Sequence, residues 1–176
     1  MRVVRNAILA GGQRDFFRVV EFSVQTNHIH LIVEAEGAAG LTSGMLGLEV
    51  RLARRLNRVL GRRGRFFADR YHSRTLKTPS EVRSALHYVL NNHAHHALSG
   101  GMRAGGRPAA SPGMDPCSSA IWFDGWNRRM ECREPWQREL LAAPRPTAAA
   151  TVWLLTDGWK LHGLLALPDP FGGRAV

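Results

Sequence analysis

The sequence predicts an α+β fold, in which a small antiparallel sheet has helices packed on one face and a helical C-terminal appendage follows. Two apolar runs, residues 17–25 and 28–34, alternate with the period of a strand and are separated by a short turn, which predicts a hairpin. Residues 41–59 and 78–96 carry apolar side chains at spacings of three and four, which predicts helices. With 44% hydrophobic residues, the chain can bury a core.

The first predicted elements are a short helix and a strand. The helix covers residues 2–10 and is closed by Gly11-Gly12. The strand of residues 17–25 follows, and its period of two predicts that one face carries Val20, Phe22 and Val24.

The second strand of the hairpin carries a His-x-His pair, His28 and His30. Because side chains on a strand alternate faces, the two imidazoles point the same way, while Ile29, Leu31 and Val33 can enter a core. Two imidazoles side by side provide half of a divalent-metal site. Ordinary packing or hydrogen bonding is the alternative interpretation of such a pair.

A long helix is predicted to begin near Leu41 or Thr42 and to end at Gly61–Gly64, followed by a second strand-like stretch from Phe66 to Leu76. Residues 51–74 contain nine arginines and a single acid, Asp69. Guanidinium groups suit phosphate because they are planar, always charged and bidentate, so we predict phosphate contacts rather than base reading. The nine are Arg51, Arg54, Arg55, Arg58, Arg62, Arg63, Arg65, Arg70 and Arg74.

The next helix starts at Thr78-Pro79-Ser80-Glu81, which combines an N-cap threonine, a proline at the first helical position and a glutamate at the third. Its polar face carries Tyr88, with Asn92 one turn later. A tyrosine near many arginines can act as a nucleophile on a phosphodiester, since cations and metals favour the phenolate. A half-buried surface aromatic is the alternative.

Composition predicts the compartment and the kind of partner. The net charge is +10 and the pI near 11.2, which indicates a polyanionic partner, most often nucleic acid. Two cysteines provide neither a disulfide framework nor a cysteine metal site, and no apolar run is long enough to predict a membrane span. We expect a cytoplasmic protein with a domain at residues 1–98, a flexible linker at 99–119 and a Trp-rich helical appendage at 120–170.

Taken in this order, these motifs resemble the HUH single-tyrosine transposases, with the REP-associated tyrosine transposases of bacteria as the most similar branch. The residues that carry the resemblance are Ser23-Val24-Gln25-Thr26-Asn27-His28-Ile29-His30-Leu31-Ile32-Val33, Phe67-Ala68-Asp69-Arg70-Tyr71-His72 and His87-Tyr88-Val89-Leu90-Asn91-Asn92.

The resemblance implies a ferredoxin-like sheet of the HUH type, with Tyr88 as the catalytic nucleophile. It implies that His28, His30 and Asn92 bind a metal, and an amide oxygen beside two imidazoles suits Mg²⁺ or Mn²⁺. The implied activity is DNA transposition, in which single-stranded DNA is cut near hairpins to leave a 5′-phosphotyrosine and a free 3′-hydroxyl. The implied partner is single-stranded or hairpin DNA, bound by a monomer or homodimer that is associated with the nucleoid.

Two alternatives stay open. Similar proteins usually begin with a strand ahead of the first helix, whereas this chain opens at that helix. It would then be a truncated, catalytically inactive DNA-binding remnant, or a chain with a mis-assigned start codon. The second alternative is a metal hydrolase that uses activated water, with His28, His30 and either His72 or His95 as ligands.

Overall fold

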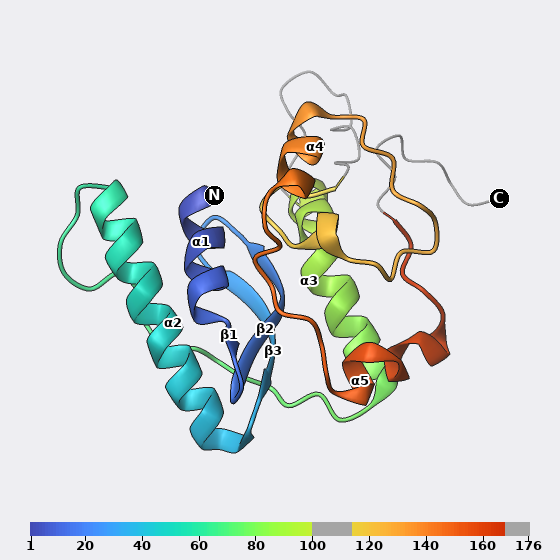
Figure 1. The fold of residues 1–176 in the computed structure, drawn as a ribbon, viewed down its shortest axis with the longest axis horizontal. Helices are drawn as coiled ribbons and strands as arrows, with labels where there is room; N and C mark the ends of the chain where they lie inside the picture. The colour runs from blue at the N-terminus through green and yellow to red at the C-terminus, as the bar shows by residue number, and fades with distance from the viewer. Residues whose placement is uncertain (100–113, 168–176) are drawn as a thin grey trace.

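The computed structural model describes the backbone of residues 1–99 and 114–167, and the side chains of residues 1–91 and 114–167. The predicted α+β fold is confirmed: three antiparallel strands in the order β1-β2-β3 form one small sheet against which helices pack (Figure 1). The elements in chain order are α1 (Arg2–Gly11), β1 (Gln13–Arg14), β2 (Phe17–Val24), β3 (Ile29–Ala35), α2 (Gly37–Val59), α3 (Pro79–Ser99), the short 3₁₀ helix η1 (Ala120–Trp122), α4 (Pro135–Ala142), α5 (Trp153–Thr156) and the 3₁₀ helix η2 (Gly158–His162).

One face of the sheet packs on α1 and α2. Phe17, Val19 and Phe22 share a core with Val4 and Ile8 of α1 and with apolar residues of α2. A bulge at Val20 adds one residue to β2, so the alternation of faces restarts beyond it. The predicted shared face is therefore confirmed for Phe22 and Val24, which both pack on the core that contains Val19, and is wrong for Val20, which is buried outside that core.

The second face of the sheet packs on α3 and on the tail. Ile32 of β3 shares a core with Val82, Leu86, Val89 and Leu90 of α3 and with tail residues that include Trp126 and Trp159. The sequence predicted helices on one face, whereas the structure has them on both, with the sheet between α2 and α3 (Figure 1). The reason is that β3 has apolar residues on both sides, Ile29, Leu31 and Val33 on one and Ile32 on the other, so both sides need cover.

The tail is bound to the sheet by hydrogen bonds as well as by packing. Ser119 N–H donates to the Phe22 carbonyl at 2.9 Å, and Ala148 N–H donates to the Val19 carbonyl at 2.8 Å. Met114, Ser118 and Ser119, at the end of the predicted linker, are buried, while residues 100–113 lie outside the described part of the chain. The described tail thus shares one core with α3.

The outer edge of β3 pairs with no strand in the described ranges 1–99 and 114–167. Gln25 N–H donates to the His28 carbonyl at 2.8 Å, so the backbone groups of alternate residues such as Leu31 point away from β2. The predicted strand from Phe66 to Leu76 is wrong, because this segment has no ladder. A cavity of about 1430 Å³ is lined by β3 on one side and by this segment on the other. Because the cavity lies between them, the segment forms no hydrogen-bonded ladder with β3.

None of the helices in the described part of the chain is long and apolar enough to cross a bilayer.

Candidate active site

His28 and His30 are placed by the hairpin. The turn at Thr26-Asn27 ends at His28, directly before β3, and His30 lies opposite Ser23 in the ladder. The two side chains point the same way, as their spacing predicted: their Nε2 atoms lie 2.8 Å apart and their ring centroids 4.5 Å apart.

This spacing fits a shared metal ion. Two imidazole nitrogens bound at about 2.1 Å to one ion, at right angles to each other, lie about 3 Å apart. The 2.8 Å between the Nε2 atoms of His28 and His30 is within a small adjustment of that value. Among the described residues no cluster of three or more His, Cys, Asp or Glu side chains could hold a metal, so a third ligand is either of another kind or outside the described side chains.

The predicted third ligand, Asn92, lies on α3 one turn beyond Tyr88, and its side chain is outside the described residues. The side chain of His95, an alternative ligand, is outside them as well. His72 is exposed on the segment that follows α2 and lines the same cavity as the histidine pair.

Tyr88 is held in place by the start and the buried face of α3. The predicted N-cap is confirmed: Glu81 N–H donates to Thr78 Oγ1 at 3.3 Å, and Glu81 Oε2 accepts from the Thr78 N–H at 3.1 Å. The backbone N–H groups of Lys77 and Thr78, which both donate to the Glu81 carboxylate, lower the pKa of Glu81. The helix buries Leu86 and Val89, which leaves Tyr88 47% exposed.

The structure brings Tyr88 against the histidine pair. The ring of Tyr88 lies 5.0 Å from the ring of His30, at an interplanar angle of 76°. The other tyrosine, Tyr71, packs on the core formed with α1 and α2, and its hydroxyl lies 3.5 Å from Thr42 Oγ1. Of the two tyrosines, Tyr88 is therefore the one in contact with the predicted metal ligands.

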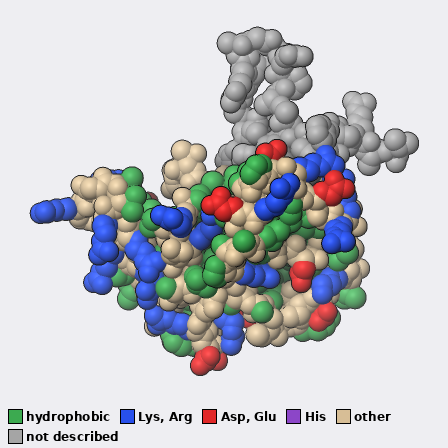
Figure 2. Space-filling model, turned by 45° about the horizontal axis from the view of Figure 1, so that its top comes forward, with side chains coloured by type: hydrophobic (Ala, Val, Ile, Leu, Met, Phe, Trp, Pro, Cys, Tyr) green, Lys and Arg blue, Asp and Glu red, His purple; other side chains and the backbone are tan. Residues whose placement is uncertain are grey.

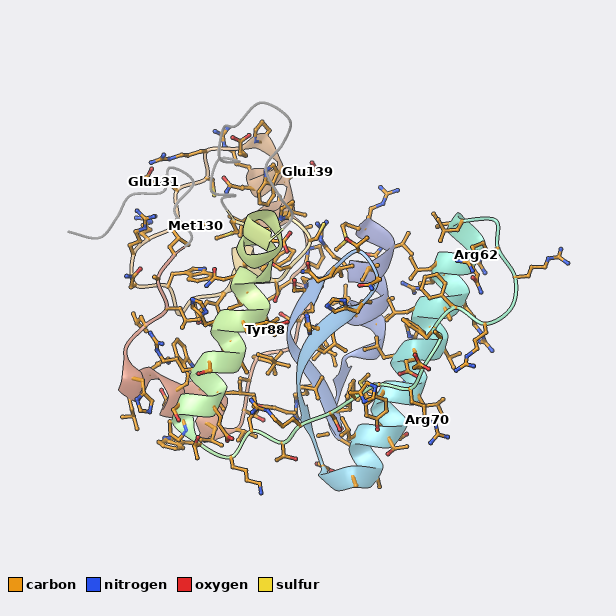
Figure 3. The ribbon with its side chains drawn as sticks, turned by 180° about the vertical axis from the view of Figure 1, so that it is seen from behind. Arg62, Arg70, Tyr88, Met130, Glu131 and Glu139 are labelled. Atoms are coloured by element: carbon orange, nitrogen blue, oxygen red, sulfur yellow. The ribbon has the colours of Figure 1, made fainter. Side chains whose placement is uncertain are left out.

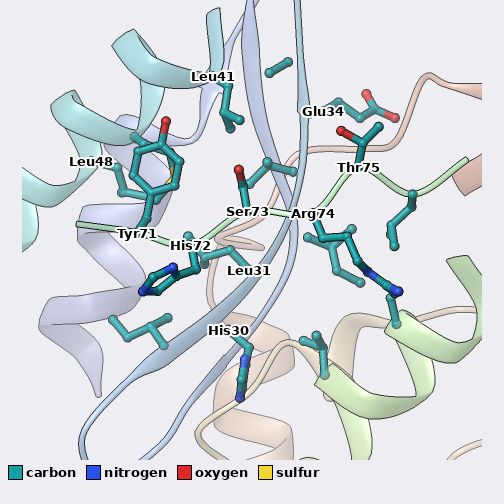
Figure 4. A pocket seen from close by; sticks show the side chains of 18 of the residues that line it. His30, Leu31, Glu34, Leu41, Leu48, Tyr71, His72, Ser73, Arg74 and Thr75 are labelled. Carbon is teal, nitrogen blue, oxygen red and sulfur yellow. The ribbon is translucent and has the colours of Figure 1, made fainter. Parts of the chain in front are cut away.

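The cavity joins these residues. It runs along β3, between α2 and α3, and His28, His30 and Tyr88 line it together with Arg70 and Arg74. Figure 4 shows His30 and Arg74 on its walls. In Figure 4, Tyr71, His72, Ser73, Arg74 and Thr75 follow one another along the wall formed by the segment after α2. The hydroxyls of Ser73 and Thr75 on this wall were not predicted as site residues.

The other predicted arginines lie on α2 and the loop after it, away from the cavity lining. Figure 2 shows Lys and Arg side chains gathered over that part of the molecule, and Figure 3 places Arg62 at the far end of α2 and Arg70 nearer its start. Arg54, Arg58, Arg62, Arg63, Arg65, Arg70 and Arg74 are exposed, and Arg51 and Arg55 are partly buried.

Two acidic residues, Glu34 and Glu49, line the cavity. Glu34 accepts hydrogen bonds from Thr151 N–H, Thr151 Oγ1 and Val152 N–H, each at 2.8 Å, so its carboxylate ties the tail to β3. Partial burial raises the pKa of Glu49, and the positive charge of the nearby Arg70 offsets part of this rise. The Glu34 carboxylate is thus engaged by the tail and unsuited to act as a metal ligand beside His28 and His30.

Asn27 was missed as a site residue. Its Oδ1 lies 2.7 Å from His28 Nδ1, and its place next to the histidine in the sequence was the signal that could have identified it.

A family model described as "Transposase IS200 like" matches residues 3–92, just over half of the 176 residues. The matched span contains the sheet, both histidines of the pair and Tyr88. No curated protein and no solved structure matches the chain.

Proposed function

Because the chain belongs to the IS200-like transposases, we propose that it cuts and rejoins single-stranded DNA through a covalent link to Tyr88. The resemblance in its motifs favours the REP-associated branch of the single-tyrosine transposases. The observation that carries the proposal is the contact between Tyr88 and His30, which unites an exposed nucleophile with a pair of predicted metal ligands.

The proposed reaction is a transfer of one phosphodiester. The Tyr88 Oη attacks the phosphorus atom, an O–P bond forms, and the bond from phosphorus to the 3′ oxygen breaks. The 3′ oxygen leaves with a proton as a 3′-hydroxyl, and the 5′ phosphate stays on Tyr88. Attack by a 3′-hydroxyl on this link reverses the step, rejoins DNA and restores the tyrosine.

His28, His30 and Asn92 would hold Mg²⁺ or Mn²⁺ beside Tyr88. The ion would supply Lewis-acid polarisation of a phosphate oxygen. The side chains of this chain orient the reaction, since the ring of His30 contacts Tyr88 and limits where its hydroxyl points.

The DNA partner follows from charge and shape. Arg70 and Arg74 line the same cavity as Tyr88, and we propose that they contact phosphates near the scissile bond, with the exposed arginines of α2 extending this basic surface. We propose single-stranded or hairpin DNA as the substrate, bound by a monomer or homodimer in the cytoplasm at the nucleoid. Loss of one exposed arginine, as in Arg58→Ala, should reduce the salt dependence of binding by about one counterion.

The test is a covalent adduct assay. Hairpin-bearing single-stranded oligonucleotides from the flanks of its own gene, labelled at the 3′ end, are incubated with the protein and Mn²⁺ and run on a denaturing gel. We expect a labelled adduct with the wild type and with Tyr71→Phe, and none with Tyr88→Phe. An adduct that persists in Tyr88→Phe, or is absent with every such oligonucleotide, refutes the proposed nucleophile.

The inactive remnant is the second candidate, and it is favoured by the outer edge of β3, which pairs with no strand in the described part of the chain. It predicts salt-sensitive DNA binding without an adduct, unchanged by Tyr88→Phe or by a chelator. The same preparations, measured by filter binding and on the denaturing gel, separate the two candidates.

A further inference from the structure

Asn27 makes a hydrogen bond that determines which nitrogen of His28 carries the proton. Its Oδ1 lies 2.7 Å from His28 Nδ1. A carbonyl oxygen can only accept, so Nδ1 must be the donor, and a neutral imidazole with a proton on Nδ1 carries its lone pair on Nε2. That lone pair is on the atom that lies 2.8 Å from His30 Nε2.

We propose that Asn27 is a positioning residue, whose side-chain carbonyl holds His28 in the Nδ1–H tautomer with Nε2 directed at the ion site shared with His30. The metal-binding part of this inference rests on the proposed function, whereas the tautomer of His28 does not depend on it. Metal-binding histidines commonly donate their second ring N–H to an acceptor that fixes ring and tautomer, and here the acceptor is the preceding residue.

His28 needs such a partner more than His30 does. His30 is in the ladder, paired with Ser23, is partly buried, and has the ring of Tyr88 against it. His28 precedes the strand and is exposed, so packing restricts its ring less. Without the Asn27 carbonyl, the Nε2–H tautomer that free imidazole side chains favour would place a proton where the ion binds.

The turn holds Asn27 in place for this role. Residues Thr26 and Asn27 are the two between Gln25 and His28, whose backbones are joined by a 2.8 Å hydrogen bond. The Asn27 side chain therefore starts next to the imidazole, and an acceptor of the same length at this position would serve equally well. Aspartate meets that requirement, whereas alanine has no acceptor.

The experiment compares Asn27→Ala, Asn27→Asp and the control Thr26→Ala in the full chain. Mn²⁺ affinity is measured by the loss of the free-ion EPR signal on titration. We expect Asn27→Ala to bind Mn²⁺ about 10–100-fold more weakly, and Asn27→Asp and Thr26→Ala to bind it about as tightly as the wild type. Thermal unfolding of the four proteins checks that the variants are folded.

A second readout needs neither metal nor DNA. The ¹⁵N NMR shifts of the His28 ring should report Nδ1–H in the wild type and in Asn27→Asp, and a gain of Nε2–H in Asn27→Ala. The proposal is overturned if Asn27→Ala keeps the Nδ1–H tautomer, if it binds Mn²⁺ as tightly as the wild type, or if the wild type binds no Mn²⁺. A wild type that shows the expected tautomer and Mn²⁺ binding but forms no DNA adduct refutes the proposed function and leaves the role of Asn27 standing.

Discussion

Replacing Gly44 with alanine should destabilise the protein, although alanine is the better helix former. Gly44 lies in α2 where this helix meets β2, and a Cβ added there would overlap the Cγ and Cδ2 atoms of Phe17 and lie 2.6 Å from its Cβ. Phe17 is fully buried, so its ring has no free space to move into and α2 would have to shift.

The expected loss follows from two opposing effects. Overpacking of a close-packed contact costs about 1–3 kcal/mol, and the upper part of that range applies because the clash involves atoms near the Phe17 backbone. The gain from replacing a glycine inside a helix is about 0.5–1 kcal/mol. The free energy of unfolding should therefore fall by roughly 1–2 kcal/mol in Gly44→Ala.

Gly47 is the matched control on the same helix. A Cβ added there would have Arg14 Nη2, at 4.0 Å, as its nearest neighbour. Gly47→Ala should therefore gain about 0.5–1 kcal/mol, opposite in sign to Gly44→Ala. Urea unfolding followed by circular dichroism measures both. If Gly44→Ala is as stable as Gly47→Ala, the close approach of α2 to Phe17 is refuted.

Three further predictions concern the sheet. Glu34→Ala removes the acceptor of three partly buried hydrogen bonds and should lower the free energy of unfolding, measured by urea unfolding, by about 2–4 kcal/mol. A change below about 0.5 kcal/mol would contradict the role given to this carboxylate. Burial raises the pKa of Glu21 from 4.5 to about 7, so the folded protein holds this proton more tightly than the unfolded chain. The contribution of Glu21 to stability is then largest below pH 4.5 and is lost as the pH rises to about 7. Urea unfolding at several pH values in this range should show that Glu21→Gln removes this pH dependence. If the free energy of unfolding of Glu21→Gln varies with pH in parallel with that of the wild type, the role given to Glu21 is disproved. Finally, amide hydrogen exchange should be faster at Leu31, on the outer edge of β3, than at Phe22, which lies opposite it in the sheet. The reason is that the Phe22 N–H donates to Ser119 Oγ at 2.8 Å, whereas the Leu31 N–H faces an edge that pairs with no strand in the described part of the chain. Equal protection of the two amides would mean that the outer edge of β3 is covered.

Elements with local signals were predicted well. The helix at the N-terminus, the hairpin and the start of α3 each depend on hydrogen bonds between residues close in the chain, such as those of Thr78 and Glu81 or of Gln25 and His28. Part of the candidate site was also predicted from local signals. The shared direction of His28 and His30 is a property of strand geometry, and the structure has their Nε2 atoms 2.8 Å apart.

Elements that need a distant partner were predicted less well. The composition of residues 66–76 favours a strand, but a strand also requires a ladder, and no strand in the described part of the chain lies beside this segment. The bulge at Val20 likewise depends on how β2 pairs with β3, and nothing in the apolar pattern marked the extra residue. The burial of Trp126 and Trp159 against α3 likewise depends on packing between segments far apart in the chain, which the Trp-rich composition of the tail did not specify.

By itself the sequence determined the kinds of groups available: two histidines on one strand face, a tyrosine on a capped helix and an arginine-rich segment. Only the tertiary structure decided which of them meet. It placed Tyr88 and not Tyr71 against His30, put Arg70 and Arg74 in the same cavity, and used Glu34 to bind the tail. The physical reason is that turns and caps are formed by neighbours in the chain, whereas the meeting of α3 with β3 depends on the packing of two cores on opposite faces of the sheet.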